Sequence, residues 1–74
     1  MDMITRTEYV RLHKEFSERI TTRRPSPILP GEVGQYLVGD HIILESHGRR
    51  NRKGMLIELP IFYANLGVIK ELRQ

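Results

Sequence analysis

Eight consecutive residues, His47 to Gly54, hold four of the twelve Lys and Arg residues and no acidic residue. The four cations are Arg49, Arg50, Arg52 and Lys53. They repel one another, so gathering them in one loop is costly unless water or an anion neutralises them. Guanidinium groups match phosphate oxygens and the O6/N7 edge of guanine, and Asn51 could pair with adenine. The octet therefore predicts contact with a polyanion, and nucleic acid is the first candidate.

The positive charge of the chain is local. The formal net charge is +3 and the pI is 9.7, but without the octet eight basic residues face nine acidic ones. We also expect two residues near this charge to take part in binding: His47 at the start of the octet, and Arg24 just beyond the first predicted helix. Arg19 and Arg23 are also explained as cations that complement the negative end of that helix.

The run Arg49–Lys53 resembles the arginine-rich segments that bind structured RNA, and it resembles the wing of winged-helix DNA-binding proteins. Five residues identify no family. Two other interpretations of the loop stay open. Its charges could simply be solvated and protect an edge strand from aggregation, or they could contact an acidic protein surface.

Enzyme chemistry has a weaker basis in the sequence. Glu45, Glu58 and His41 fall on neighbouring predicted strands, which with nearby Arg would suit a small ribonuclease. Ordinary strand alternation also puts both Glu side chains in solvent, and 74 residues leave little room for a deep pocket. His13, His41 and His47 lie on three different predicted elements without helical pairing. We therefore expect no catalytic residue, no metal site and no cofactor.

The first predicted element is an amphipathic helix over residues 6–23. Thr5 and Glu8 have the spacing of a capping box, which begins a helix. An apolar stripe follows at spacings of three and four, made of Tyr9, Leu12, Phe16 and Ile20. Pro25 ends the helix because it biases the preceding residue away from the α region. A Pro-rich connector is predicted over 25–31.

The second part of the chain predicts a sheet over residues 35–59. Gly39-Asp40 separates two β-rich runs as a hairpin turn, and a third strand ends at Pro60. The basic octet is the loop between the second and third strands. For residues 61–72 the sequence indicates a short helical turn at 61–66 and then a closing strand.

These elements predict one α+β domain over residues 1–74, in which an N-terminal amphipathic helix precedes a small antiparallel three- to four-stranded meander or open barrel. Such a short chain has a thin core, so a protein partner and a homo-oligomer stay open. Apolar stretches are at most four residues long, and acidic Asp2 follows Met1. We therefore expect no membrane contact and a cytoplasmic location.

The function predicted from the sequence is a small, non-enzymatic, regulator-like nucleic-acid-binding module, for DNA or RNA. The alternative is a small adaptor or inhibitor that docks on an acidic surface of a larger enzyme or complex. The ribonuclease is a third hypothesis.

Overall fold

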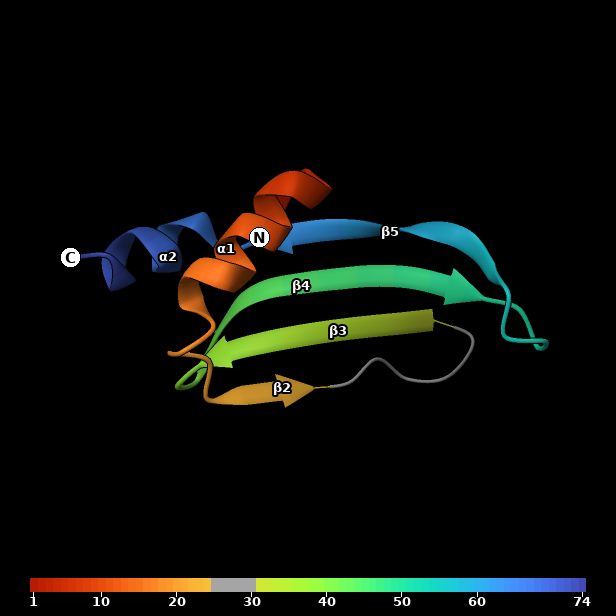
Figure 1. Ribbon diagram of the computed structural model, residues 1–74, viewed down its shortest axis with the longest axis horizontal. Coiled ribbons are helices and arrows are strands. Elements are labelled where there is room, and N and C mark those ends of the chain that lie inside the picture. Colours follow the sequence, from red (N-terminus) through yellow and green to blue (C-terminus); the bar gives the residue numbers. More distant parts are fainter. Residues whose placement is uncertain (25–30) are drawn as a thin grey trace.

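The computed structural model describes residues 1–24 and 31–74. Their elements in chain order are β1 (Asp2–Ile4), α1 (Arg6–Phe16), β2 (Thr22–Arg24), β3 (Gly31–Val38), β4 (His41–Arg50), β5 (Leu56–Ala64) and α2 (Leu66–Leu72). The strands form one open antiparallel sheet in the order β1-β5-β4-β3-β2, with five strands in the described part of the chain. Figure 1 shows β5, β4, β3 and β2 side by side. The α+β class is confirmed, but a strand precedes the first helix and the sheet has more strands than predicted.

Helix α1 begins where the sequence predicts. The Thr5 hydroxyl oxygen accepts a hydrogen bond from the Glu8 N–H at 3.1 Å, and the Glu8 carboxylate accepts one from the Thr5 N–H at 3.4 Å. These two bonds complete the capping box and satisfy backbone donors that the first helical turn cannot.

The predicted helix over residues 6–23 is wrong beyond Phe16, where α1 ends. The N–H groups of Arg19 and Ile20 both bond to the carbonyl of Phe16, and the chain then turns into β2. Threonines 21 and 22 are β-branched, and Thr22 pairs with Leu37 of β3. Ladder pairing at the sheet edge thus replaces further helical turns.

Pro60 does not end the third strand of the meander, so this prediction is also wrong. Strand β5 continues to Ala64 because the ladder is irregular at Pro60. His47 pairs with Ile61 and Arg49 with Glu58, so Gly48 alone faces two residues of β5. Proline is tolerated at such a bulge because the ladder hydrogen bond it cannot donate is already interrupted.

The end of the chain reverses the predicted order of a helical turn and then a strand. Residues 61–64 belong to β5, and α2 follows, capped by the Asn65 side chain, which accepts from the Val68 N–H at 3.3 Å. Burial of Ile69 overrides the strand preference of its β-branched side chain. The place of a closing strand is taken by β1, whose Ile4 pairs with Phe62.

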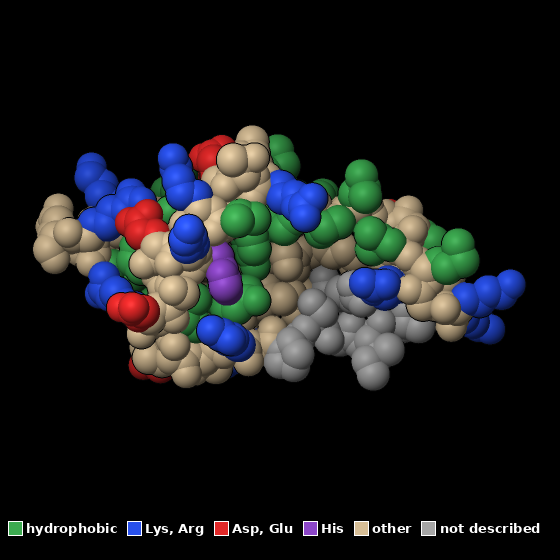
Figure 2. All heavy atoms as spheres, viewed as in Figure 1, with side chains coloured by type: hydrophobic (Ala, Val, Ile, Leu, Met, Phe, Trp, Pro, Cys, Tyr) green, Lys and Arg blue, Asp and Glu red, His purple; other side chains and the backbone are tan. Residues whose placement is uncertain are grey.

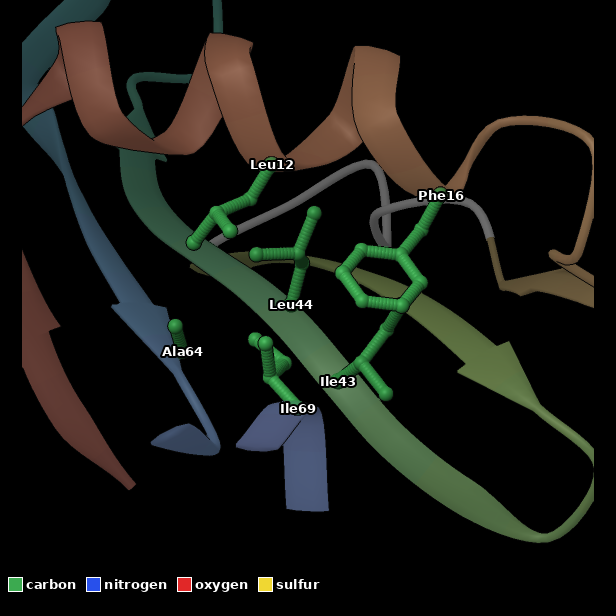
Figure 3. Packing of buried hydrophobic residues seen from close by; sticks show 6 residues of the cluster. All are labelled: Leu12, Phe16, Ile43, Leu44, Ala64 and Ile69. Atoms are coloured by element: carbon green, nitrogen blue, oxygen red, sulfur yellow. The ribbon is translucent and has the colours of Figure 1, made fainter. Parts of the chain in front are cut away.

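The core lies at one end of the sheet, under α1 and α2. It consists of Leu12 and Phe16 from α1, Ile43 and Leu44 from β4, Ala64 from β5 and Ile69 from α2 (Figure 3). Two contacts hold the helices together. Arg73 donates two hydrogen bonds of 2.8 Å to Glu15, and Arg19 donates to the Leu72 carbonyl at 2.7 Å.

The other end of the sheet extends beyond the helices as a long β4–β5 hairpin flanked by β3 (Figure 1). The molecule measures 44 × 22 × 18 Å as a result. Of the predicted connector over 25–31, residues 25–30 lie outside the described residues, and Gly31 is the first residue of β3. Within residues 1–24 and 31–74, neither helix has the length and apolar character needed to cross a bilayer.

Candidate functional site

The basic octet is divided between a strand and a turn. His47 to Arg50 belong to β4, and the loop that joins β4 to β5 covers only residues 51–55. The predicted loop over 47–54 is therefore shorter and shifted. Ladder pairing explains this, because Arg49 and Arg50 pair with Glu58 and Leu56 across the hairpin.

Asn51 holds the turn in shape. Its Oδ1 accepts hydrogen bonds from the N–H groups of Lys53 at 2.9 Å and Met55 at 3.0 Å. Its backbone N–H donates to the Met55 carbonyl, and Gly54 completes the turn with a φ of 82°, a value that favours glycine. Pairing with adenine would need the amide oxygen of Asn51, which the loop already uses twice.

The four cations of the tip differ in what surrounds them. Arg49 Nη1 lies 3.0 Å from Glu58 Oε1, and both side chains are about half exposed. Arg50 Nη1 donates to the Gly54 carbonyl at 2.9 Å, which braces the turn. Within residues 1–24 and 31–74, no hydrogen bond or ion pair involves the side chains of Arg52 and Lys53. Figure 2 shows Lys and Arg side chains at this end of the molecule.

Arg24 is not brought to the tip. It lies in β2 opposite Gln35, whereas the strand position opposite Arg49 is Gly31. Four residues along β3 separate these two positions, which is about 13 Å at the usual strand rise. Arg24 is also two strands away from β4. Arg24 could therefore bind the same ligand as the basic tip only if that ligand extends across the sheet.

His47 lies on a face that sequence reasoning did not identify. Its Nε2 contacts Glu45 Oε1, and its ring stands edge-on to Tyr63 with centroids 5.3 Å apart. Gln35 Nε2 donates to the other Glu45 oxygen at 3.4 Å. The spacing of two along a strand, which puts Glu45 and His47 on one face, was the available signal. His41, grouped with Glu45 in the ribonuclease hypothesis, lies instead at the start of β4.

A carboxylate that orients an imidazole is a common arrangement for proton transfer. The nearest hydroxyl in the sequence, Ser46, points to the opposite face, where it forms a hydrogen bond with Tyr9. Burial raises the pKa of the Tyr9 phenol above its ordinary value near 10, and this outweighs the hydrogen bond with Ser46, which lowers it.

The described residues contain no group of three His, Cys, Asp or Glu that could hold a metal ion.

Beside the basic tip lies an apolar surface that sequence reasoning missed. Five side chains between 43% and 81% exposed form what we call the apolar arm: Met55, Leu56, Ile57, Leu59 and Ile61. Their alternation predicted a half-buried strand, but α1 does not reach this part of β5. Figure 2 shows hydrophobic side chains between α1 and the tip.

Two hollows flank the apolar arm. A groove of about 670 Å³ lies between α1 and β5 and is lined by Arg6, Tyr9, Val10, Leu56, Leu59, Pro60 and Phe62. A smaller hollow of about 260 Å³ is lined by Val33, His47, Gly48, Arg49, Glu58, Leu59 and Ile61. Leu59, which lines both, is therefore at the sheet edge between them.

No protein-family model, no curated protein and no solved structure matches the chain.

Proposed function

We propose that this protein is a non-enzymatic nucleic-acid-binding module that contacts phosphates through the tip of the β4–β5 hairpin. One observation carries the proposal. Arg52 and Lys53 are exposed at the end of a projecting hairpin, and their side chains have no anionic partner in residues 1–24 and 31–74. A phosphate backbone supplies closely spaced anions that such a tip can reach.

The shape of the tip supports the same function. Asn51 and Arg50 brace the turn through hydrogen bonds to its backbone, so the cations project from an ordered loop. Order in the free protein reduces the entropy lost on binding. Arg49 would add a further phosphate contact only by leaving Glu58, so Arg52 and Lys53 are the primary contacts.

The test is a titration of labelled duplex DNA, single-stranded DNA and hairpin RNA at several salt concentrations. The double variant Arg52→Ala/Lys53→Ala removes two phosphate contacts. We expect the slope of log K against log salt to become shallower by about 1.8 for duplex DNA and about 1.4 for single strands.

The matched control is Arg11→Ala/Lys14→Ala, which removes the same charge from exposed positions of α1. This control should keep the slope of the wild type. If both double variants reduce the slope equally, only the overall charge matters and the tip is not the contact. The absence of binding by the wild type would also refute the proposal. RNA cleavage that is lost in His47→Asn would contradict its non-enzymatic part.

A second candidate function is an adaptor or inhibitor that docks on an acidic surface of a larger protein. The apolar arm favours it, because phosphates offer no partner to exposed Leu and Ile side chains next to the cations. Such a partner would saturate at one stoichiometry and would be unaffected by random DNA or RNA.

A further inference from the structure

The protein exposes more surface than its size requires. A compact monomer of 8.7 kDa is expected to expose about 4,700 Å². The accessible surface is 5491 Å². The excess of about 800 Å² equals the area that each partner buries in a standard protein interface. The radius of gyration of 12.8 Å, against about 11 Å for a compact chain of this length, agrees with an extended shape.

The apolar arm contains five of the nine large apolar side chains that are exposed in the described part of the chain. Leu59 is 81% exposed, Met55 63% and Ile57 52%. Between Met55 and Ile61 the only charged residue is Glu58, and Arg49 of the same chain already pairs with it. Interfaces between identical subunits are more apolar than transient ones and contain few charges at their centre. The arm has this composition.

From these observations we propose that two copies of the chain associate through the apolar arm in a symmetric dimer. A two-fold interface requires a patch that is complementary to itself. Here Leu59 projects from the sheet edge, and with Leu56 it also lines a groove of about 670 Å³ between α1 and β5. The Leu59 side chain of each copy enters the groove of the other.

The two copies meet through side chains and not by extending the sheet. Residues 56–61 of β5 have an edge that β1, which pairs only with 62–64, leaves open. Pro60 and the irregular pairing of β5 with β4 interrupt this edge, and such features prevent strand addition. Packing of side chains on the arm is not affected by them.

The charges near the arm do not oppose this arrangement. Arg52 and Lys53 belong to the turn, beyond the end of β5, and can remain in solvent outside the apolar contact. The dimer would carry two basic tips, but the inference does not rest on nucleic-acid binding.

Sedimentation velocity of the wild type over a range of concentrations tests the proposal. We expect a species of twice the 8.7 kDa chain mass. Leu59→Gln changes a side chain that the monomer leaves exposed, and we expect it to raise the dissociation constant about 100-fold or more, because each dimer loses two buried leucines. Leu66→Gln, at an exposed apolar residue of α2, is the control and should leave the dissociation constant unchanged.

A second measurement needs no variant. Because a dimer dissociates as it unfolds, the thermal midpoint of the wild type should rise with protein concentration. A wild type that remains monomeric, or a dimer that Leu59→Gln does not weaken, would overturn the proposal. DNA binding by Leu59→Gln is measured in parallel, so that failure of the dimer and failure of the nucleic-acid proposal give different results.

Discussion

Replacement of Glu58 by Gln should strengthen nucleic-acid binding, because it releases a cation of the tip. In the free protein Arg49 Nη1 lies 3.0 Å from Glu58 Oε1, and the two side chains are 53% and 57% exposed. Salt bridges between side chains this exposed contribute only about 0–1 kcal/mol to the free energy of unfolding. The variant should therefore fold normally, and Arg49 becomes available for a phosphate.

The size of the effect follows from counterion release. One added phosphate contact makes the slope of log K against log salt steeper by about 0.9 for duplex DNA. If the variant and the wild type bind equally at about 1 M salt, this difference in slope gives the variant a roughly eightfold higher affinity at about 0.1 M. The net charge of +3 also rises by one, so the experiment needs a variant with the same change in charge elsewhere.

Glu71→Gln provides that control, since Glu71 is exposed on α2, far along the chain from the tip. Fluorescence anisotropy with duplex DNA at several salt concentrations measures both affinity and slope. We expect only Glu58→Gln to steepen the slope. The reasoning is refuted if the two variants behave alike, or if Glu58→Gln binds DNA more weakly than the wild type.

Three further outcomes can be measured by chemical or thermal unfolding. Asn51→Ala should cost about 1–2 kcal/mol and weaken DNA binding, because two backbone N–H groups of the turn lose their shared acceptor, Asn51 Oδ1. Asn51→Asp keeps an acceptor oxygen at this position and should unfold like the wild type. The pKa of Tyr9 is raised in the folded state, so its contribution to stability is complete below pH 10 and is lost as the pH rises through the folded-state pKa. Tyr9→Phe should therefore flatten the alkaline part of the curve of stability against pH. An unchanged curve would contradict this. Phe16→Ala should cost about 3–5 kcal/mol, since Phe16 is 2% exposed at the centre of the core, and a loss below about 1 kcal/mol would place the core elsewhere.

Local chemistry determined several features that the sequence alone predicted. The capping box at Thr5 requires only residues within one helical turn, and it begins α1 as expected. Gly39 is in the turn between β3 and β4 with a φ of 60°, which a two-residue hairpin needs. The concentration of cations near residue 50 is likewise a property of adjacent residues. Such features depend on short-range geometry and follow from neighbours in the chain.

Tertiary structure alone decided the features that depend on distant partners. α1 ends at Phe16 because residues 22–24 gain a ladder with β3, and Ile69 is helical because the core buries it. Strand register decided that Arg49 is next to Glu58, which leaves Arg52 and Lys53 as the two cations of the tip whose side chains have no partner among the described residues. An alternating strand cannot indicate whether a helix covers it. The exposure of the apolar arm therefore depends on the tertiary structure, in which the short α1 covers one end of the sheet and leaves the other uncovered.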